Sequence, residues 1–515
     1  MLFSSPLFIF VFLPAAMLGF QILGRSGRRY TFTWLSLVSF VFYGYWNPKF
    51  VFFLAGSVLL NFLIAKQIVR SSERARRGWL LAGICLNIGA LVYFKYLFPF
   101  LDFLHSHGAL ASSFGSVVLP LGISFFTFTQ IGYLVDLEQG MAQDQDLISY
   151  TLFVTFFPHL IAGPIVHHRE MMPQFAAQRR FGFRAEDVAV GLSWFIMGLF
   201  KKVVIADYLG RVACAVFKYP QGFGVSATWA GVLCYSLQLY FDFSGYSDMA
   251  IGLARMFSIR FPQNFNSPYK AANIIDFWQR WHMTLTRYLT LYVYNPVSLA
   301  INRRRLAAGK KVSKKADATL EGFFNLVAVP TLFTMFVAGV WHGAGFQFLV
   351  FGVLHGIYLC VNHAWRIFVP VTSHLRKLLP KPLSVLLTYM AVLVGQVFFR
   401  ADDTHDAVYM LATMLGIHGK GASLAHNPYP GFRGALFDSP QLLLLSLLTG
   451  YLIVWGLPNT EELLGEMTLA PRWYSRFLPA VQWRPNLPWS IGLAGGLLAG
   501  LLMLESSASF LYFQF

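Results

Sequence analysis

Long apolar runs alternate with short polar segments along most of this chain. A helix that crosses the hydrocarbon core of a bilayer needs about 20 consecutive apolar residues, and runs of roughly that length recur here. They predict an all-α, polytopic integral membrane protein with about 11 to 13 transmembrane helices. The runs cover residues 2–23, 30–46, 50–69, 79–98, 117–135, 186–206, 226–243, 322–341, 344–363, 383–399, 441–457 and 490–505.

Two regions interrupt the pattern. Residues 148–166 are apolar but contain Pro158 and Pro164, which predicts a re-entrant segment whose broken backbone is satisfied by surrounding protein. Residues 245–299 mix aromatic, charged and apolar side chains. That mixture predicts partly buried or surface-lying helices rather than simple spans.

The chain is expected to form one membrane-embedded domain over residues 1–515. We predict N-terminal helices over 1–135, a core with the candidate catalytic residues over 136–400, and outer loops with C-terminal helices over 401–515. The first apolar run lacks the basic start of a secretory signal, so we expect it to be a retained transmembrane helix. Two polar stretches, 400–439 and 458–488, are expected to face outward.

The composition separates this chain from soluble proteins. Only 12% of the 515 residues are charged and 56% are hydrophobic, whereas soluble domains carry roughly 25% charged residues. This excludes a disordered chain, a collagen-like repeat and an ordinary cytosolic enzyme. The four cysteines form no CxxC pair and predict buried free thiols rather than disulfides or a metal site: Cys85, Cys214, Cys234 and Cys360.

The positive charge is concentrated in a few places. The chain has 40 Lys and Arg against 23 Asp and Glu, a net charge of +17. Each basic cluster adjoins an apolar run, which predicts cytoplasmic loops in contact with membrane lipids and an outward N-terminus. Nucleic-acid binding is therefore not expected. The clusters contain 23 of the basic residues and cover 25–29, 66–77, 166–184, 300–315 and 365–381.

His342 is the strongest candidate for chemistry within an apolar run. It lies in the segment VAGVWHGAGF, beside Trp341 and between small residues that would let a substrate approach the imidazole. Ionisable groups inside a membrane are costly and often functional. A histidine can act as a general base near neutral pH. The alternative is a core histidine hydrogen-bonded to a neighbouring helix.

A second candidate region is the polar and aromatic block 236–295. His282 lies there between Trp281 and Met283 and is the second candidate functional residue. The density of ionisable groups predicts a polar cavity or tunnel. Structural ion pairs, such as Asp276 with Arg280 at helical i,i+4 spacing, are the alternative for most of the individual charges.

The remaining histidines carry weaker signals. His355 lies 13 residues after His342, about 220° away on one ideal helix, so we expect a structural role outside the site. The pairs His105/His107 and His167/His168 lie near predicted loops and are expected to be solvated. The sequence contains no HExxH zinc motif, no phosphate-binding P-loop and no GxSxG elbow, and we predict no metal site.

Two segments together resemble the membrane-bound O-acyltransferase (MBOAT) family. They are FPQNFNSPYKAANIIDFWQRWHMTLTRYL and, about sixty residues later, GVWHGAGFQFLVFGVLHG. More narrowly, the chain is similar to the bacterial branch that takes part in alginate O-acetylation. Weaker supporting segments are PLGISFFTFTQIGYLVD, FPHLIAGPIV, LQLYFDFSGYSDMAIG, VFFRADD and FLYFQF.

The resemblance implies a ring of tilted helices around a central tunnel in a bacterial inner membrane. It implies that His342 is the catalytic histidine and His282 the second family histidine. It also implies an acyl-CoA donor, here acetyl-CoA, that enters from the cytoplasm, and no bound cofactor. The acceptor would be an exported polysaccharide, reached directly or through a periplasmic or extracellular SGNH-type partner. Gln279 stands where many relatives carry arginine.

Our hypothesis for the mechanism is direct acyl transfer. Neutral His342 takes the proton of an acceptor hydroxyl as its oxygen attacks a thioester carbonyl, and His282, Asn266 or backbone N–H groups stabilise the oxyanion. Asp242, Asn266, Trp281 and Trp341 are expected to bind substrate. A D-alanyl transferase acting on teichoic acid is the alternative within the class. A transporter or channel is the alternative outside it.

Overall fold

The structure is a computed structural model that describes residues 1–110, 112, 115, 117–177, 182–370, 380–418, 421–424, 439–464 and 482–504. Some predictions fall outside the described residues. They concern parts of two basic clusters, parts of the two polar stretches and the closing segment: Arg179, Arg180, Arg376, Lys377, positions within 400–439 and 458–488, and FLYFQF.

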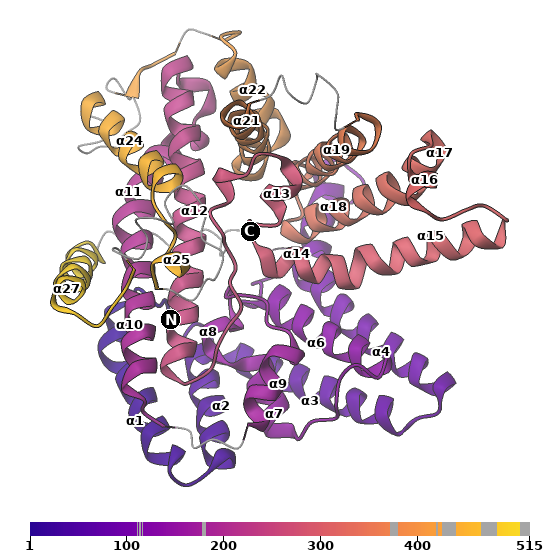
Figure 1. Ribbon diagram of the computed structural model, residues 1–515, viewed down its shortest axis with the longest axis vertical. Coiled ribbons are helices and arrows are strands. Elements are labelled where there is room, and N and C mark those ends of the chain that lie inside the picture. The colour runs from indigo at the N-terminus through magenta and orange to yellow at the C-terminus, as the bar shows by residue number, and fades with distance from the viewer. Residues whose placement is uncertain are drawn as a thin grey trace. The chain divides into compact units, whose positions relative to one another are not determined.

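The described chain is built from helices, and no β-strand occurs in these residues, which confirms the predicted all-α fold. Figure 1 labels its helices, which contacts divide into two compact units. Unit 1 contains Met1–Val204, Phe243–Gln263 and the described part of 460–514. Unit 2 contains Ile205–Asp242 and Asn264–Asn459. The prediction of a single domain stays a prediction.

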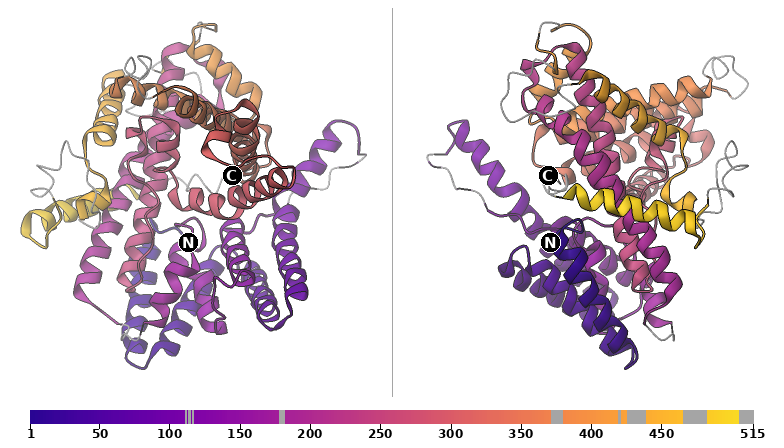
Figure 2. Two further views of the ribbon diagram at one scale, coloured as in Figure 1. Left: turned by 45° about the vertical axis from the view of Figure 1, so that its right-hand side comes forward. Right: turned by 90° about the vertical axis from the view of Figure 1, so that its left-hand side faces the viewer.

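Unit 1 contains most of the N-terminal helices. The long helix formed by α4 and α5 continues through a π-helical turn, Tyr93–Leu97 (Figure 2). The helices are α1 (Leu13–Gly24), α2 (Arg28–Gly44), α3 (Pro48–Arg70), α4 (Glu73–Val92), α5 (Phe98–Ser106), α6 (Ile123–Glu138), α7 (Leu147–Thr155), α8 (Phe157–Leu160), α9 (His168–Ala176), α10 (Ala185–Phe200), α25 (Thr460–Leu464) and α27 (Leu487–Leu502).

Unit 2 contains the segments with both candidate histidines. Helix α12 (Val225–Met256) belongs to this unit up to Asp242 and to unit 1 from Phe243. The other helices are α11 (Asp207–Lys218), α13 (Ile274–Trp278), α14 (Met283–Leu289), α15 (Asn295–Ala307), α16 (Lys314–Asp317), α17 (Leu320–Gly322), α18 (Val329–His342), α19 (Phe346–Phe368), α21 (Lys381–Arg400), α22 (Thr404–Met414) and α24 (Pro440–Gly456).

The helices confirm a polytopic membrane architecture. Each predicted apolar run overlaps a helix of the described chain, although α6 begins only at Ile123 within the run 117–135. Three shorter apolar helices, Phe8–Gly24, Pro440–Gly456 and Leu487–Leu502, accompany the longer ones. The count of 11 to 13 spans and the central tunnel stay predictions. Six described segments are long and apolar enough to cross a membrane: Pro48–Arg70, Glu73–Ser106, Ala185–Lys218, Leu320–His342, Phe346–Phe368 and Lys381–Arg400.

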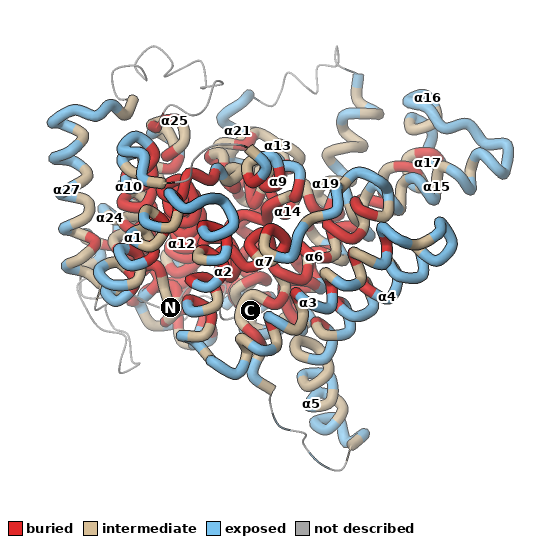
Figure 3. Tube along the Cα trace, turned by 90° about the horizontal axis from the view of Figure 1, so that it is seen from below, coloured by how far each residue is buried: buried red, intermediate tan, exposed pale blue. Residues whose placement is uncertain are grey.

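Large apolar side chains remain on the outer faces of these helices, where lipid would cover them. Phe52 on α3 is 81% exposed and Leu502 on α27 is 76% exposed. Figure 3 shows the contrast between these outer helices and the buried second half of α12. Hydrocarbon is the environment in which such surfaces carry no penalty.

The candidate span 226–243 extends further than predicted, because α12 continues without a break to Met256. Glycines explain how this polar stretch is buried. A Cβ on Gly198 would meet the carbonyl oxygen of Gly245 at 2.5 Å, and one on Gly191 would meet that of Gly252 at 2.5 Å. Two glycine pairs, seven residues apart on each helix, therefore bring α10 and α12 into backbone contact.

Asp248, one of two charged residues in this buried stretch, has partners within unit 1. Asp248 accepts hydrogen bonds from the Lys201 ammonium at 2.6 Å and the Thr460 hydroxyl at 2.7 Å. A buried charge needs such partners. The short helices α13 and α14 confirm the predicted irregular character of the rest of 245–299, and Arg280 binds Asp276 at 2.7 Å as predicted.

The interrupted segment at 148–166 is confirmed. The Asp146 carboxylate caps α7, and the helix breaks at Phe156 before the single turn of α8. The N–H of Phe157, freed by the break, donates to the Ser39 hydroxyl of α2 at 3.0 Å. Broken backbone is thus satisfied by protein, as a re-entrant segment requires. Its depth in a membrane stays a prediction.

The cysteine prediction is correct in part. All four thiols are free, but only Cys234 is buried, and Cys85 is exposed on α4. Cys85 lies in a helix that is long and apolar enough to cross a membrane. Apolar neighbours in the sequence therefore indicated a membrane setting for this thiol rather than a protein core.

Candidate active site

His342 is the last residue of α18, where a short break separates that helix from α19. The break comprises Gly343, Ala344 and Gly345. The side chain is 6% exposed and lies among aromatic rings. Its imidazole meets Phe399 edge to face at 4.9 Å between ring centroids and Phe351 at 5.8 Å. His342 is therefore held by rings from α19 and α21.

The glycines around His342 lie where two helices pack against each other. A Cβ on Gly343 would overlap the ring of Phe348. One on Gly339 would meet the carbonyl oxygen of Phe348 at 2.5 Å, and one on Gly352 would meet the Cα of Gly339 at 2.9 Å. These glycines allow α18 and α19 to pack closely. The approach of a substrate to the imidazole stays a prediction.

His282 is placed by an unusual backbone conformation. It is the N-cap residue of α14 and adopts left-handed angles, φ 44° and ψ 52°. Such angles are uncommon for a residue other than glycine and often occur at functional sites. The side chain is 1% exposed. Burial lowers the pKa of its imidazole to about 3, so the ring is neutral at physiological pH.

Asn264 holds His282 and the residues that follow it. Its side-chain oxygen Oδ1 lies 3.0 Å from Nδ1 of His282 and accepts from the hydroxyl of Thr284 at 2.9 Å. Its backbone oxygen accepts from the N–H of Met283 at 2.9 Å. Asn264 was not among the predicted site residues. The only signal in the sequence is its place in the FPQNFN segment that precedes WQRWH.

Trp341 brings the two candidate histidines to one place. Its ring centroid lies 4.8 Å from that of His342 and 6.5 Å from that of His282. Both imidazoles thus contact one indole, although sixty positions separate them in the chain. The geometry agrees with the expectation that His282 and His342 belong to one site. Their roles as catalytic residues stay predictions.

Trp281 lies within a stack of rings next to His282. It is parallel to Tyr269 at 6.2 Å and to Phe277 at 5.7 Å. Tyr269 in turn belongs to a hydrogen-bonded group that links four parts of unit 2 through Ser236, Tyr389, Gln396 and Tyr451. These hydrogen bonds hold Tyr269, and through it the stack that contains Trp281, in place.

The other two predicted substrate-binding residues, Asn266 and Asp242, also belong to unit 2. The side-chain oxygen of Asn266 accepts from the amide of Asn459 at 3.2 Å, and the N–H of Asn266 donates to the carbonyl of Arg280 at 2.9 Å. Asp242 lies on α12 and is 1% exposed. Their contact with substrate stays a prediction.

His355 is closer to the site than predicted. The break at 343–345 places it on α19 rather than on a continuation of α18, so the angle expected on one helix does not apply. Its ring lies 4.6 Å from that of Phe351, which also contacts His342. Its Nδ1 accepts from the indole N–H of Trp278 at 3.3 Å. This hydrogen bond agrees with the predicted structural role.

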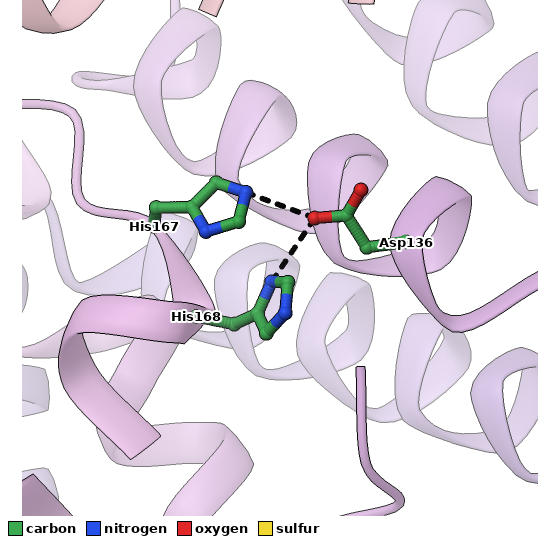
Figure 4. A group of neighbouring side chains, drawn as sticks. All are labelled: Asp136, His167 and His168. Carbon is green, nitrogen blue, oxygen red and sulfur yellow. Dashed lines mark ion pairs between the residues drawn. The ribbon is translucent and has the colours of Figure 1, made fainter. Parts of the chain in front are cut away.

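Unit 1 contains a second polar cluster, formed by Asp136, His167 and His168 (Figure 4). Oδ2 of Asp136 lies 2.8 Å from Nε2 of His167 and 3.2 Å from Nδ1 of His168. The expectation that these histidines are solvated is wrong, because His168 is only 5% exposed. A carboxylate thirty positions earlier in the chain anchors them.

Two histidines and a carboxylate are a common ligand set for transition metals. Here the hydrogen bonds do not fit a metal ion. The N–H of Arg169 donates to Nδ1 of His167 at 3.2 Å, which leaves the proton of that neutral ring on Nε2, the atom that faces Asp136. A metal-bound histidine carries its proton on the other nitrogen. The cluster is a hydrogen-bonded clamp between α6 and α9.

Another group with metal-ligand residues, Asp403, His405 and Asp406, lies at the start of α22. Its histidine side chain is 75% exposed and 3.8 Å from Asp406. Open surface acids of this kind are common without a metal. The prediction of no metal site therefore stays a prediction.

Comparison with known proteins identifies the family of this chain. A family model for the membrane-bound O-acyltransferase family matches residues 136–309, a range that includes His282 and ends before His342. A peptidoglycan O-acetyltransferase of Helicobacter pylori is 39% identical over 454 residues, covering 83% of this chain and 81% of that protein. A probable alginate O-acetylase, AlgI, of Pseudomonas aeruginosa is 37% identical over 426 residues, covering 80% and 75%.

A more distant relative carries a different name. A teichoic acid D-alanyltransferase of Bacillus subtilis is 24% identical over 416 residues, covering 78% of this chain and 98% of that protein. The similarity to the O-acetylation proteins is higher and spans most of both chains. This chain belongs to the membrane-bound O-acyltransferase family and is an integral membrane acyltransferase of its polysaccharide O-acetylation branch.

Proposed function

We propose that this protein transfers acetyl groups from cytoplasmic acetyl-CoA, across the bacterial inner membrane, for O-acetylation of an exported polysaccharide. The observation that carries the proposal is the pair of buried imidazoles, His282 and His342, on one indole in a chain whose relatives are named for O-acetylation. Peptidoglycan and alginate are the acceptors in those names. A glycan hydroxyl is the chemistry that they share.

His342 acts as the base in this proposal. The acceptor oxygen attacks the thioester carbonyl while its proton passes to His342. The carbon–sulfur bond then breaks, and the departing thiolate takes the proton. Aromatic neighbours at 4.9 and 5.8 Å keep the imidazole away from water and in one orientation. General-base catalysis of this kind typically contributes about 10²–10⁴-fold to the rate.

Acetyl transfer by His342→Ala is the direct test. Purified protein is given acetyl-CoA with a labelled acetyl group and an acceptor glycan, with and without an SGNH-type partner. We expect His342→Ala to lose label transfer while His107→Ala, at an exposed histidine, keeps it. Normal transfer by a folded His342→Ala protein would refute the assignment. The labelled molecule also identifies whether glycan or partner receives the acetyl group.

The orientation is part of the same proposal. We propose an outward N-terminus and cytoplasmic basic loops, such as the arm 300–315 with its exposed Arg303, Arg304 and Lys311. Single cysteines introduced at these positions should react with an impermeant maleimide in inside-out vesicles only. Labelling in right-side-out vesicles would reverse the orientation.

The Bacillus subtilis relative supports D-alanyl transfer to a teichoic acid as a second candidate. The donor distinguishes the two: a D-alanyl thioester on a carrier protein instead of acetyl-CoA. A transporter or channel is the candidate from another class. Liposomes containing the protein would then pass an intact solute without consuming thioester.

A further inference from the structure

The arm 300–315 connects two long helices of unit 2. One continuous helix, α14 with α15, extends over Met283–Ala307 and begins next to His282. The next, α17 with α18, extends over Leu320–His342 and is apolar enough to cross a membrane. At 1.5 Å per residue each helix is about 35 Å long. The arm is therefore the turn of a helical hairpin, and its loop is exposed (Figure 3).

Most of the positive charge of the arm has no acidic partner. Glu321 accepts from the Lys310 ammonium at 2.6 Å and from the Arg305 guanidinium at 3.2 Å, which joins the end of α15 to α17. The arm itself contains no acidic residue. Its other five cations are exposed and form no ion pair with a residue that the structure describes: Arg303, Arg304, Lys311, Lys314 and Lys315.

Exposed leucines lie beside this charge. Leu299, Arg303 and Leu306 follow one another at intervals of four and three positions on α15, so they share one face of that helix. The two leucines are 50% and 61% exposed. Leu320, where the apolar helix begins, is 83% exposed. A soluble phosphate compound would neutralise the cations but would leave these apolar side chains in water.

We infer that the arm binds anionic phospholipid, with headgroup phosphates against its lysines and arginines and acyl chains against Leu299 and Leu306. Basic clusters next to a membrane span attract anionic lipid, and helices with leucines beside basic residues lie in the headgroup region. The apolar helix Leu320–His342 begins shortly after the arm, so the arm lies at that level. The inference does not rest on acyl transfer.

The experiment places an environment-sensitive fluorophore on α15. Leu306→Cys is labelled in the full-length protein after its four native cysteines have been replaced by alanine. Ala308→Cys is the matched control, because it is also exposed and lies about 200° away around the helix. Both proteins are reconstituted in nanodiscs of phosphatidylcholine alone, or of phosphatidylcholine and phosphatidylglycerol in equal amounts.

We expect the probe at position 306 to shift to shorter wavelength and to lose most of its quenching by acrylamide only when phosphatidylglycerol is present. The probe at position 308 should not respond. Equal emission from position 306 in the two lipids, or an equal response from position 308, would overturn the inference. Molar salt should reverse the shift, because it shortens the screening length to about 3 Å.

Two further samples identify the bound group. Each Lys or Arg near an anionic surface typically strengthens binding about fivefold, so removing four cations should weaken docking about 10²–10³-fold and abolish the shift. The variant is Arg303→Gln, Lys311→Gln, Lys314→Gln and Lys315→Gln combined. Pyrophosphate added to phosphatidylcholine nanodiscs should leave the probe unchanged. A shift with pyrophosphate and none with phosphatidylglycerol would overturn the inference in favour of a soluble anion.

Hydrogen exchange tests the same surface without any substitution. Backbone amides of residues 308–319 in the unaltered protein should exchange more slowly in nanodiscs that contain phosphatidylglycerol than in phosphatidylcholine alone. Amides near Lys49, an exposed cation on another helix, should exchange at equal rates in the two lipids. Equal exchange of residues 308–319 in both lipids would overturn the inference even if the cysteine variants failed to fold.

Discussion

Leucine at Gly198 should force α10 away from the second half of α12. A single Cβ at this position already meets the carbonyl oxygen of Gly245 at 2.5 Å and the N of Met249 at 2.8 Å. Neither is a flexible side-chain end that can move aside. The helices must separate, or α12 must bend, to admit even one added carbon.

The cost follows from the overpacking of a close interface. Extra methylene groups in a well-packed core typically cost about 1–3 kcal/mol. Gly191→Leu meets Gly252 in the same way and lies two helical turns away, about 10 Å along the axis. Sites so separated are nearly additive, so the double variant should lose about 2–6 kcal/mol.

Thermal denaturation of the detergent-solubilised protein measures this effect. Gly89→Leu on α4 is the matched control, because a Cβ there has nothing within 4 Å. Removing a glycine from a helix interior gains about 1 kcal/mol, so the control should be neutral or stabilised. Equal denaturation midpoints for Gly198→Leu and Gly89→Leu would refute the backbone-contact argument.

Three further outcomes are expected. Asp136→Ala leaves the buried His168 clamp without its acceptor and should cost about 1–3 kcal/mol, measured as a lower midpoint; an unchanged midpoint contradicts the clamp. Tyr389→Phe removes a buried hydroxyl from Ser236 and should cost about 1–3 kcal/mol by the same assay. The lowered pKa of His282 keeps the folded ring neutral, so stability present above pH 6.5 should be lost as pH falls toward 3. His282→Asn should flatten this decline between pH 7 and 5, and an identical decline would contradict it.

The helices of this protein could be predicted because membrane spans are encoded locally. A run of about 20 apolar residues has few other stable structures in a bilayer. The end of α12 could not be found in this way. The sequence left a polar cavity and structural ion pairs open for Asp248 and Arg255, and it could not show that Lys201 and Asp187, from distant parts of unit 1, bind them.

The sequence identified the candidate site residues but could not show how they are arranged in space. His342 and His282 were identified from their neighbours in the chain. Their contact through Trp341 depends on how segments sixty positions apart pack together. Asn264 was missed for a similar reason, since an asparagine in a polar segment gives no sign of which side chain it will bind. The Asp136 clamp likewise needs a partner thirty positions away.

The hydrogen bonds of Asn264 also bear on how the protein is made. The contacts that orient His282 join residues 264–266 to residues 280–284, a separation of about twenty positions. Local contacts form quickly because little chain entropy is lost when they close. We therefore expect this half of the site to form before α18 and α19 are synthesised, so that His342 joins a loop that is already in place.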